Sequence, residues 1–138
     1  MTALITGGTS GIGAAFARQL AARGTDLVLV ARDAERLATH AESLHREFGV
    51  EVDILPADLA ERDQVTIVQK RLEDPDRPID LFINNAGFGL HKDLLIKDTS
   101  TDERGFDVMI RAVFLLGGAA GRAMQARGTG TIITTCLL

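Results

Sequence analysis

Short apolar runs alternate with helical segments along the whole chain, and this alternation restricts the fold more than any other feature. The runs have the length of buried strands, and the segments between them carry apolar residues at helical spacing. Strands separated by helices of this length indicate parallel β-α-β crossovers. The expected strands are residues 2–6, 27–30, 50–55, 79–83 and 131–135. The expected helices are residues 11–23, 34–48, 61–72 and a long helix that begins within 99–102 and ends near Arg127.

The length of 138 residues suits one domain with a core, residues 1–138. The run 50–55 alternates apolar residues with Glu51 and Asp53, which is typical of a strand at a sheet edge. The prediction is an α/β fold: a doubly wound parallel sheet between two layers of helices, with strand order 3-2-1-4-5 and truncated after strand 5.

Charge and composition exclude several classes of partner. The net charge of −4 argues against nucleic acid or an anionic membrane as the main partner. No apolar run approaches the roughly 20 residues of a membrane span, and the start at Met1 shows no secretion signal. Cys136 is the single cysteine, so no internal disulfide is possible, and a cytoplasmic location is expected.

A glycine-rich turn, Thr6-Gly7-Gly8-Thr9-Ser10-Gly11-Ile12-Gly13, joins the first expected strand to the first helix. Glycine permits backbone angles that a Cβ forbids and lets a phosphate approach the backbone. The start of the helix offers free N–H groups and the positive end of its dipole. The turn therefore predicts a phosphate-binding loop, with a plain tight turn as the alternative.

Three motifs resemble the cofactor-binding portion of the short-chain dehydrogenase/reductase family: Thr-Gly-x-x-x-Gly-Ile-Gly at 6–13, Asp58-Leu59, and Asn84-Asn85-Ala86-Gly87. The resemblance implies a three-layer Rossmann-type fold that binds a nicotinamide dinucleotide. It implies that Asp58 accepts from the adenine amino group and that the 84–87 motif lines the nicotinamide ribose and braces the sheet. Two alternatives stay open: Asp58 only caps the helix that follows it, and Asn84 and Asn85 only form a turn. The candidate cofactor-binding residues are Gly7, Thr9, Ser10, Gly11, Ile12, Gly13, Arg32, Asp58, Leu59, Asn84, Ala86 and Gly87.

The end of the second expected strand bears on the choice of dinucleotide. An acidic residue at this tip binds both ribose hydroxyls of NAD, but here Arg32 comes first and Asp33 follows. A basic residue at this place in the family faces the 2′-phosphate, and arginine can hold phosphate with a forked pair of donors. The sequence favours NADP(H), with NAD(H) possible. The alternative is a solvated Arg32 beside an Asp33 that only caps the next helix.

The family's catalytic Asn, Ser, Tyr and Lys have no counterparts here. Met109 and Leu137 stand at the positions that match the Asn and the Ser, and the sequence contains no tyrosine. We expect no catalytic residue and no dehydrogenase turnover from this chain. Three explanations for the missing catalytic residues stay open: the chain is a fragment, its reading frame is shifted near the end, or it is a degenerate family member. Cys136 has no partner base, and the histidines have no metal-ligand spacing, so no metal site is expected.

The resemblance implies an oxidoreductase that, when complete, acts on a carbonyl or secondary alcohol of a small molecule. A non-catalytic nucleotide-binding or interaction module is the alternative. A methyltransferase is a third candidate, against which the 84–87 motif counts. A homo-oligomer is expected for two reasons. The expected strand 131–135 leaves an open sheet edge that can pair with another chain. The long helix carries glycines 117, 118 and 121, and in the family this helix commonly forms the dimer interface. The alternative is that these glycines only seat the helix on its own sheet.

Overall fold

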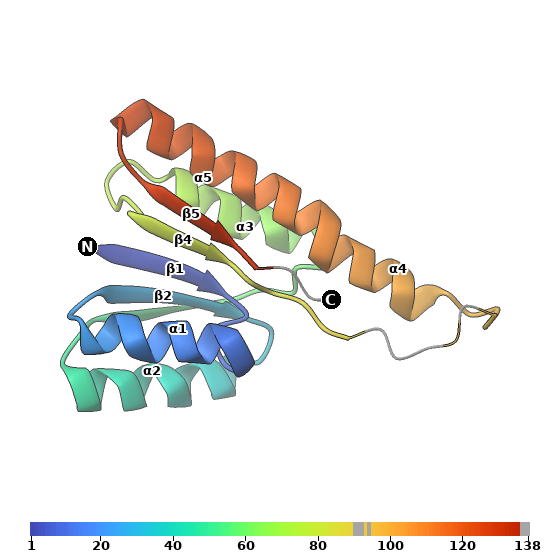
Figure 1. The fold of residues 1–138 in the computed structure, drawn as a ribbon, viewed down its shortest axis with the longest axis horizontal. Helices are drawn as coiled ribbons and strands as arrows, with labels where there is room; N and C mark the ends of the chain where they lie inside the picture. The colour runs from blue at the N-terminus through green and yellow to red at the C-terminus, as the bar shows by residue number, and fades with distance from the viewer. Residues whose placement is uncertain (90–92, 94, 136–138) are drawn as a thin grey trace.

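In the computed structural model, which describes residues 1–89, 93 and 95–135, five strands form one sheet. Their order is β3-β2-β1-β4-β5 and every neighbouring pair is parallel, which confirms the predicted topology. The arrowheads of β1, β2, β4 and β5 point toward one edge of the sheet in Figure 1, here called the carboxyl edge. The strands are β1 (Thr2–Thr6), β2 (Asp26–Ala31), β3 (Val52–Pro56), β4 (Leu81–Asn84) and β5 (Thr131–Thr134).

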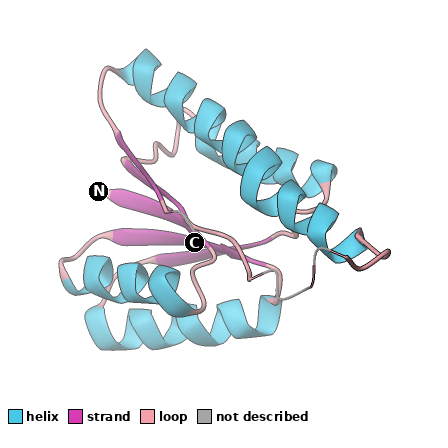
Figure 2. Ribbon diagram, turned by 45° about the vertical axis from the view of Figure 1, so that its right-hand side comes forward, coloured by secondary structure: helices cyan, strands magenta, loops and turns pink. Residues whose placement is uncertain are grey.

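Helices cover both faces of the sheet (Figure 2). One face packs against α1 (Gly11–Ala22) and α2 (Ala34–Phe48), around a core that includes Ile5, Leu29 and Leu37. The other face packs against α3 (Arg62–Glu73) and α5 (Val113–Arg127), around a second core that includes Phe82 and Leu116. The strands β1, β2 and β4 are thus buried on both faces, as parallel strands between two helical layers require. The two outer strands, β3 and β5, are mostly exposed.

The long helix differs from the single α-helix that was expected. It consists of α4 (Ser100–Phe106), a π-helical segment η1 (Asp107–Ala112) and α5, and Figure 1 shows it projecting beyond the sheet. The side chain of Asn84, at the end of β4, donates to the Val113 carbonyl at 3.0 Å, directly after the π segment. Apolar spacing along the helix could not reveal this segment, because the contact that accompanies it comes from the sheet.

Two strands begin two residues later than predicted, and both shifts have the same kind of cause. Val50 is buried, but its carbonyl lies 2.8 Å from His45 Nδ1 at the end of α2, and β3 begins at Val52. Ile79 is buried too, but its carbonyl accepts from Arg127 Nη2 at 2.5 Å, and β4 begins at Leu81. In each case a side chain near the end of a helix hydrogen-bonds to the backbone carbonyl two residues before the strand begins.

Candidate functional site

A cleft of about 230 Å³ lies at the carboxyl edge of the sheet. Its walls come from the turn after β1, the end of β2, the loop after β3, the segment after β4 and the long helix. In open α/β sheets, ligands bind beyond the carboxyl ends of the strands where the strand order reverses. The predicted site residues that line it are Gly7, Thr9, Ser10, Arg32, Asp58, Leu59, Ala86 and Gly87.

The glycine turn forms one wall of the cleft, and its glycines are required by close contacts. Gly7 has φ +68°, and a Cβ there would lie 3.1 Å from the Ala86 Cα. A Cβ on Gly13 would lie 2.0 Å from the Gly7 carbonyl oxygen, which real structures do not allow. The start of α1 therefore packs directly against the backbone of the glycine turn. This close packing leaves no room for a side chain at Gly7 or Gly13.

The beginning of α1 is suited to an anion. Ser10 is the N-cap residue and makes no side-chain capping bond, so the first N–H groups of α1 are not satisfied by it. Ser10 and Thr9 line the cleft, so the positive end of the helix dipole lies at its wall. Gly11 and Ile12 are exposed in this first turn and Gly13 is buried behind it, and none of the three lines the cleft.

The end of β2 places two arginines on the cleft wall. Arg32 follows the strand directly, and Arg36 is in the first turn of α2. Asp33 lies between them and accepts from the Arg36 backbone N–H at 3.0 Å, so it caps α2. The sequence analysis singled out Arg32 and missed Arg36. Its spacing in the sequence was the available clue, because Arg36 follows the N-cap residue Asp33 by three residues, about one helical turn.

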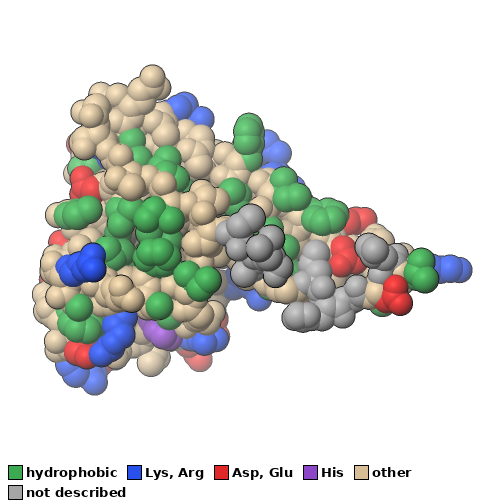
Figure 3. Space-filling view, in the orientation of Figure 1, with side chains coloured by type: hydrophobic (Ala, Val, Ile, Leu, Met, Phe, Trp, Pro, Cys, Tyr) green, Lys and Arg blue, Asp and Glu red, His purple; other side chains and the backbone are tan. Residues whose placement is uncertain are grey.

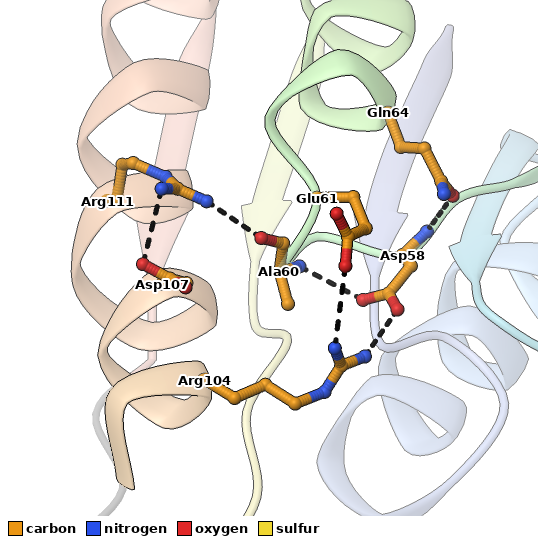
Figure 4. A network of polar contacts seen from close by, with 7 residues as sticks. All are labelled: Asp58, Ala60, Glu61, Gln64, Arg104, Asp107 and Arg111. Carbon is orange, nitrogen blue, oxygen red and sulfur yellow. Dashed lines mark hydrogen bonds and ion pairs between the residues drawn. The ribbon is translucent and has the colours of Figure 1, made fainter. Parts of the chain in front are cut away.

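Asp58 is held in a network of polar contacts in the loop after β3 (Figure 4). Its carboxylate forms an ion pair with Arg104 of α4 and accepts from the Ala60 N–H at 3.0 Å. Burial raises the pKa of the Asp58 carboxyl, but the hydrogen bonds from Arg104 and Ala60 and the charges of Arg104 and Arg32 together bring it below its ordinary value. The hydrogen bond to Asp58 in turn raises the pKa of Arg104. Asp58 is therefore a fixed anion in the cleft wall.

The Asn-Asn-Ala-Gly motif after β4 is fastened to the glycine turn. The N–H groups of Asn85 and Ala86 donate to Thr6 Oγ1 at 2.9 and 3.0 Å, and Asn85 Nδ2 donates to the Thr6 carbonyl at 3.3 Å. The side chain of Asn84 is 2% exposed and points to the long helix, away from the cleft. Asn84 thus braces the sheet, and Ala86 and Gly87 form the cleft wall.

Two other kinds of site are absent from the described part of the chain. It contains no group of three or more His, Cys, Asp or Glu residues that could hold a metal ion. None of its helices has both the length and the apolar character needed to cross a bilayer. Cys136, Leu137 and His91, which the sequence analysis considered, lie outside the described residues.

Comparison with known proteins decides the family. The model of the family described as short chain dehydrogenase matches residues 1–137. The chain belongs to the short-chain dehydrogenase family. It is 33% identical to gluconate 5-dehydrogenase of Gluconobacter oxydans over 134 residues, which are 97% of this chain and 52% of that protein.

Solved structures of family members agree with the fold. A short-chain dehydrogenase from Sphingobium yanoikuyae in complex with NADPH has a TM-score of 0.92 and 40% sequence identity, over 96% of this chain and 52% of that one. The L-sorbose reductase of Gluconobacter frateurii, complexed with NADPH and L-sorbose, has a TM-score of 0.87 and 34% identity, over 96% and 51%. The chain therefore spans about half the length of these relatives.

Met109, which the sequence analysis matched to the catalytic Asn of the family, lies within the described residues. It lies in the π-helical segment, half buried, and packs against the core beneath α3 and α5. Its thioether cannot donate a hydrogen bond, whereas the family's asparagine at this position can. The position has an apolar packing role in this chain.

Proposed function

We propose that this chain is the dinucleotide-binding portion of an oxidoreductase that uses NADP(H) and acts on a carbonyl or secondary alcohol of a small molecule. The observation that carries the proposal is the cleft at the carboxyl edge, with the glycine turn at one wall and Arg32 and Arg36 at another. When bound, the nicotinamide supplies or accepts the hydride. The NADPH complexes of the Sphingobium and Gluconobacter proteins support the choice of cofactor.

The chain's own residues would bind and orient the dinucleotide. The turn at Gly7 and the start of α1 would receive the pyrophosphate, because both present backbone without side chains in the way. Arg32 and Arg36 would pair with the 2′-phosphate through charge-assisted hydrogen bonds. Asp58 would accept from the adenine amino group, and Ala86 and Gly87 would lie beside the nicotinamide ribose.

A non-catalytic nucleotide-binding module is the second candidate, and one observation favours it. Met109 packs into the core where the family places a polar side chain, and the chain has no tyrosine. Transfer of a proton at the substrate oxygen needs a positioned acid or base. The residues that line the described cleft include no Tyr, Lys or His.

One experiment tests the cofactor and can exclude the second candidate. The purified 138-residue chain is expected to bind NADPH more tightly than NADH in a titration that follows the fluorescence of the reduced nicotinamide. With ketones added, we expect no loss of the NADPH absorbance. Absence of binding by the folded chain would refute the proposed function, and turnover that co-purifies with the chain would refute the non-catalytic candidate.

We further propose that the chain forms a homodimer through the long helix. Phe106, Ile110 and Phe114 are 52%, 63% and 79% exposed, at intervals of four residues, and Figure 3 shows hydrophobic side chains standing out along this helix. Gly121 lies further along the same helix with nothing within 4 Å of an added Cβ, which leaves room for a second backbone to come close. An exposed apolar stripe of this kind marks an interaction surface.

A charge placed in this stripe is expected to separate the protomers. Phe114→Asp should shift the chain from dimer to monomer in sedimentation at tens of micromolar, because a carboxylate cannot be buried against apolar side chains without a partner. Ile67→Asp is the matched control: Ile67 is 47% exposed on α3, outside the stripe, and its replacement should leave the dimer intact. A native chain that sediments as a monomer would contradict the proposal.

A further inference from the structure

Two arginines of the long helix hold the loop that follows β3 (Figure 4). Arg104 pairs with the Asp58 carboxylate and lies 3.8 Å from the carboxylate of Glu61. Arg111 donates to the Ala60 carbonyl at 2.7 Å and lies 3.2 Å from Asp107. The two arginines differ in two respects. Arg104 lines the cleft and binds a side chain that also lines it, whereas Arg111 lies outside the cleft and binds a carbonyl that does not line it.

The contacts of Asp58 fix where its carboxylate points. One oxygen, Oδ1, accepts from the Ala60 N–H, and the other, Oδ2, accepts from Arg104. The backbone N–H of Asp58 donates to Gln64 Oε1 at 2.6 Å, which fixes the main chain as well. Each carboxylate oxygen has two acceptor sites, so both keep capacity for a donor from the cleft. The side chain is 23% exposed, enough for such a donor to reach it.

Arg104 also neutralises charge. It bridges Asp58 and Glu61, two carboxylates on one short loop. Without the guanidinium, Asp58 would keep only the Ala60 bond on its carboxylate, and Glu61 would become an unpaired like charge nearby. The position of the Asp58 carboxylate and the lowering of its pKa therefore both depend in part on a residue from another element, α4.

We propose that Arg104 is the positioning residue that makes this cleft select a base with an exocyclic amino group, as in adenine, over the same base with a carbonyl. An amino group donates to the oriented carboxylate. A carbonyl oxygen at the same place would face an acceptor with no proton between them, and it would lose its bonds to water. This inference rests on the proposed binding of a nicotinamide dinucleotide.

The test compares NADPH with its deamino analogue, in which hypoxanthine replaces adenine and a carbonyl replaces the amino group. The native chain is expected to bind NADPH about tenfold more tightly than the analogue, the effect of one charge-assisted hydrogen bond. In Arg104→Met, NADPH affinity is expected to fall about tenfold while the affinity for the analogue changes little, so the preference nearly disappears. Arg104→Lys keeps the positive charge but loses the forked pair of N–H donors. This variant should show part of the native preference for NADPH over the analogue.

Arg111→Met is the matched control. It removes an arginine from the same helix that holds the same loop, so a merely structural role would affect both variants alike. We expect it to weaken both dinucleotides by the same factor. An unchanged preference in Arg104→Met, or an equal loss of preference in Arg111→Met, would overturn the inference and leave the proposed function standing. Failure of the native chain to bind either dinucleotide would overturn both.

Discussion

Replacing Gly13 with alanine is expected to abolish dinucleotide binding and to lower the free energy of unfolding by about 1–3 kcal/mol or more. The added Cβ would lie 2.0 Å from the Gly7 carbonyl oxygen and 2.7 Å from Asn85 Nδ2. Neither atom can move away freely. Gly7 is bonded to the Val30 carbonyl through its N–H, and Asn85 is bonded to Thr6 and Thr135. Chemical denaturation and an NADPH titration measure the two effects.

Gly24→Ala is the control for this experiment. Gly24 has φ +82°, so alanine is strained there, but no atom lies within 4 Å of the added Cβ. Gly24 also follows the end of α1 that is remote from the glycine turn. We expect a loss of about 1–2 kcal/mol in stability and unchanged NADPH binding. Native stability and native affinity in Gly13→Ala would show that the turn can relax and would contradict the expectation.

Arg32→Ala is expected to weaken NADPH binding by about ten- to a hundredfold and to leave NADH binding nearly unchanged. The loss corresponds to one charge-assisted contact with the 2′-phosphate, about 1.5–3 kcal/mol. Only NADPH carries that phosphate, so the ratio of the two dissociation constants is the measurement. Arg36→Ala should act in the same direction, because Arg36 lines the same part of the cleft.

Arg23→Ala serves as the control for charge alone. Arg23 is exposed at the C-terminal end of α1, outside the cleft, so its removal changes the net charge equally without touching the site. We expect both affinities to stay as they are. Equal losses for NADPH and NADH in Arg32→Ala would show that Arg32 does not contact the 2′-phosphate.

The fold was predictable because its determinants are local. Apolar runs such as 27–30 and helix-ending glycines such as Gly49 act within a few residues of themselves. The order of the strands is the usual order of a doubly wound sheet. What the sequence could not show depends on contacts between distant segments. Arg104 reaches Asp58 across 46 residues, and Asn84 reaches Val113 beside the π segment across 29. Neither pair leaves a periodic signal.

The candidate site likewise contains residues that the sequence identified and residues whose role only the structure showed. The glycine turn and Asp58 were found by their motifs, and Arg32 by its place at the end of β2. Arg36 was missed because it resembles an ordinary surface arginine until the structure places it beside Arg32 on the cleft wall. Asn84 was expected along the nicotinamide ribose and in the sheet, and its burial against the long helix can be seen only after the helix has been placed.

The position of β1 between β2 and β4 has a consequence for the order in which the protein can form during synthesis. Ala3 pairs with Leu27 on one side and with Leu81 on the other, so the central strand is made before both of its partners and is enclosed only after the second has been made. At roughly 5–20 residues per second, several seconds pass between the emergence of its two partners from the ribosome. During that interval the edge of β1 that will pair with β4 presents unpaired N–H and C=O groups. Leu4 also lacks the α5 side chains with which it shares a core in the folded protein. A nascent chain of this topology can therefore associate prematurely through its central strand, and a chaperone that binds extended apolar segments would find a target there.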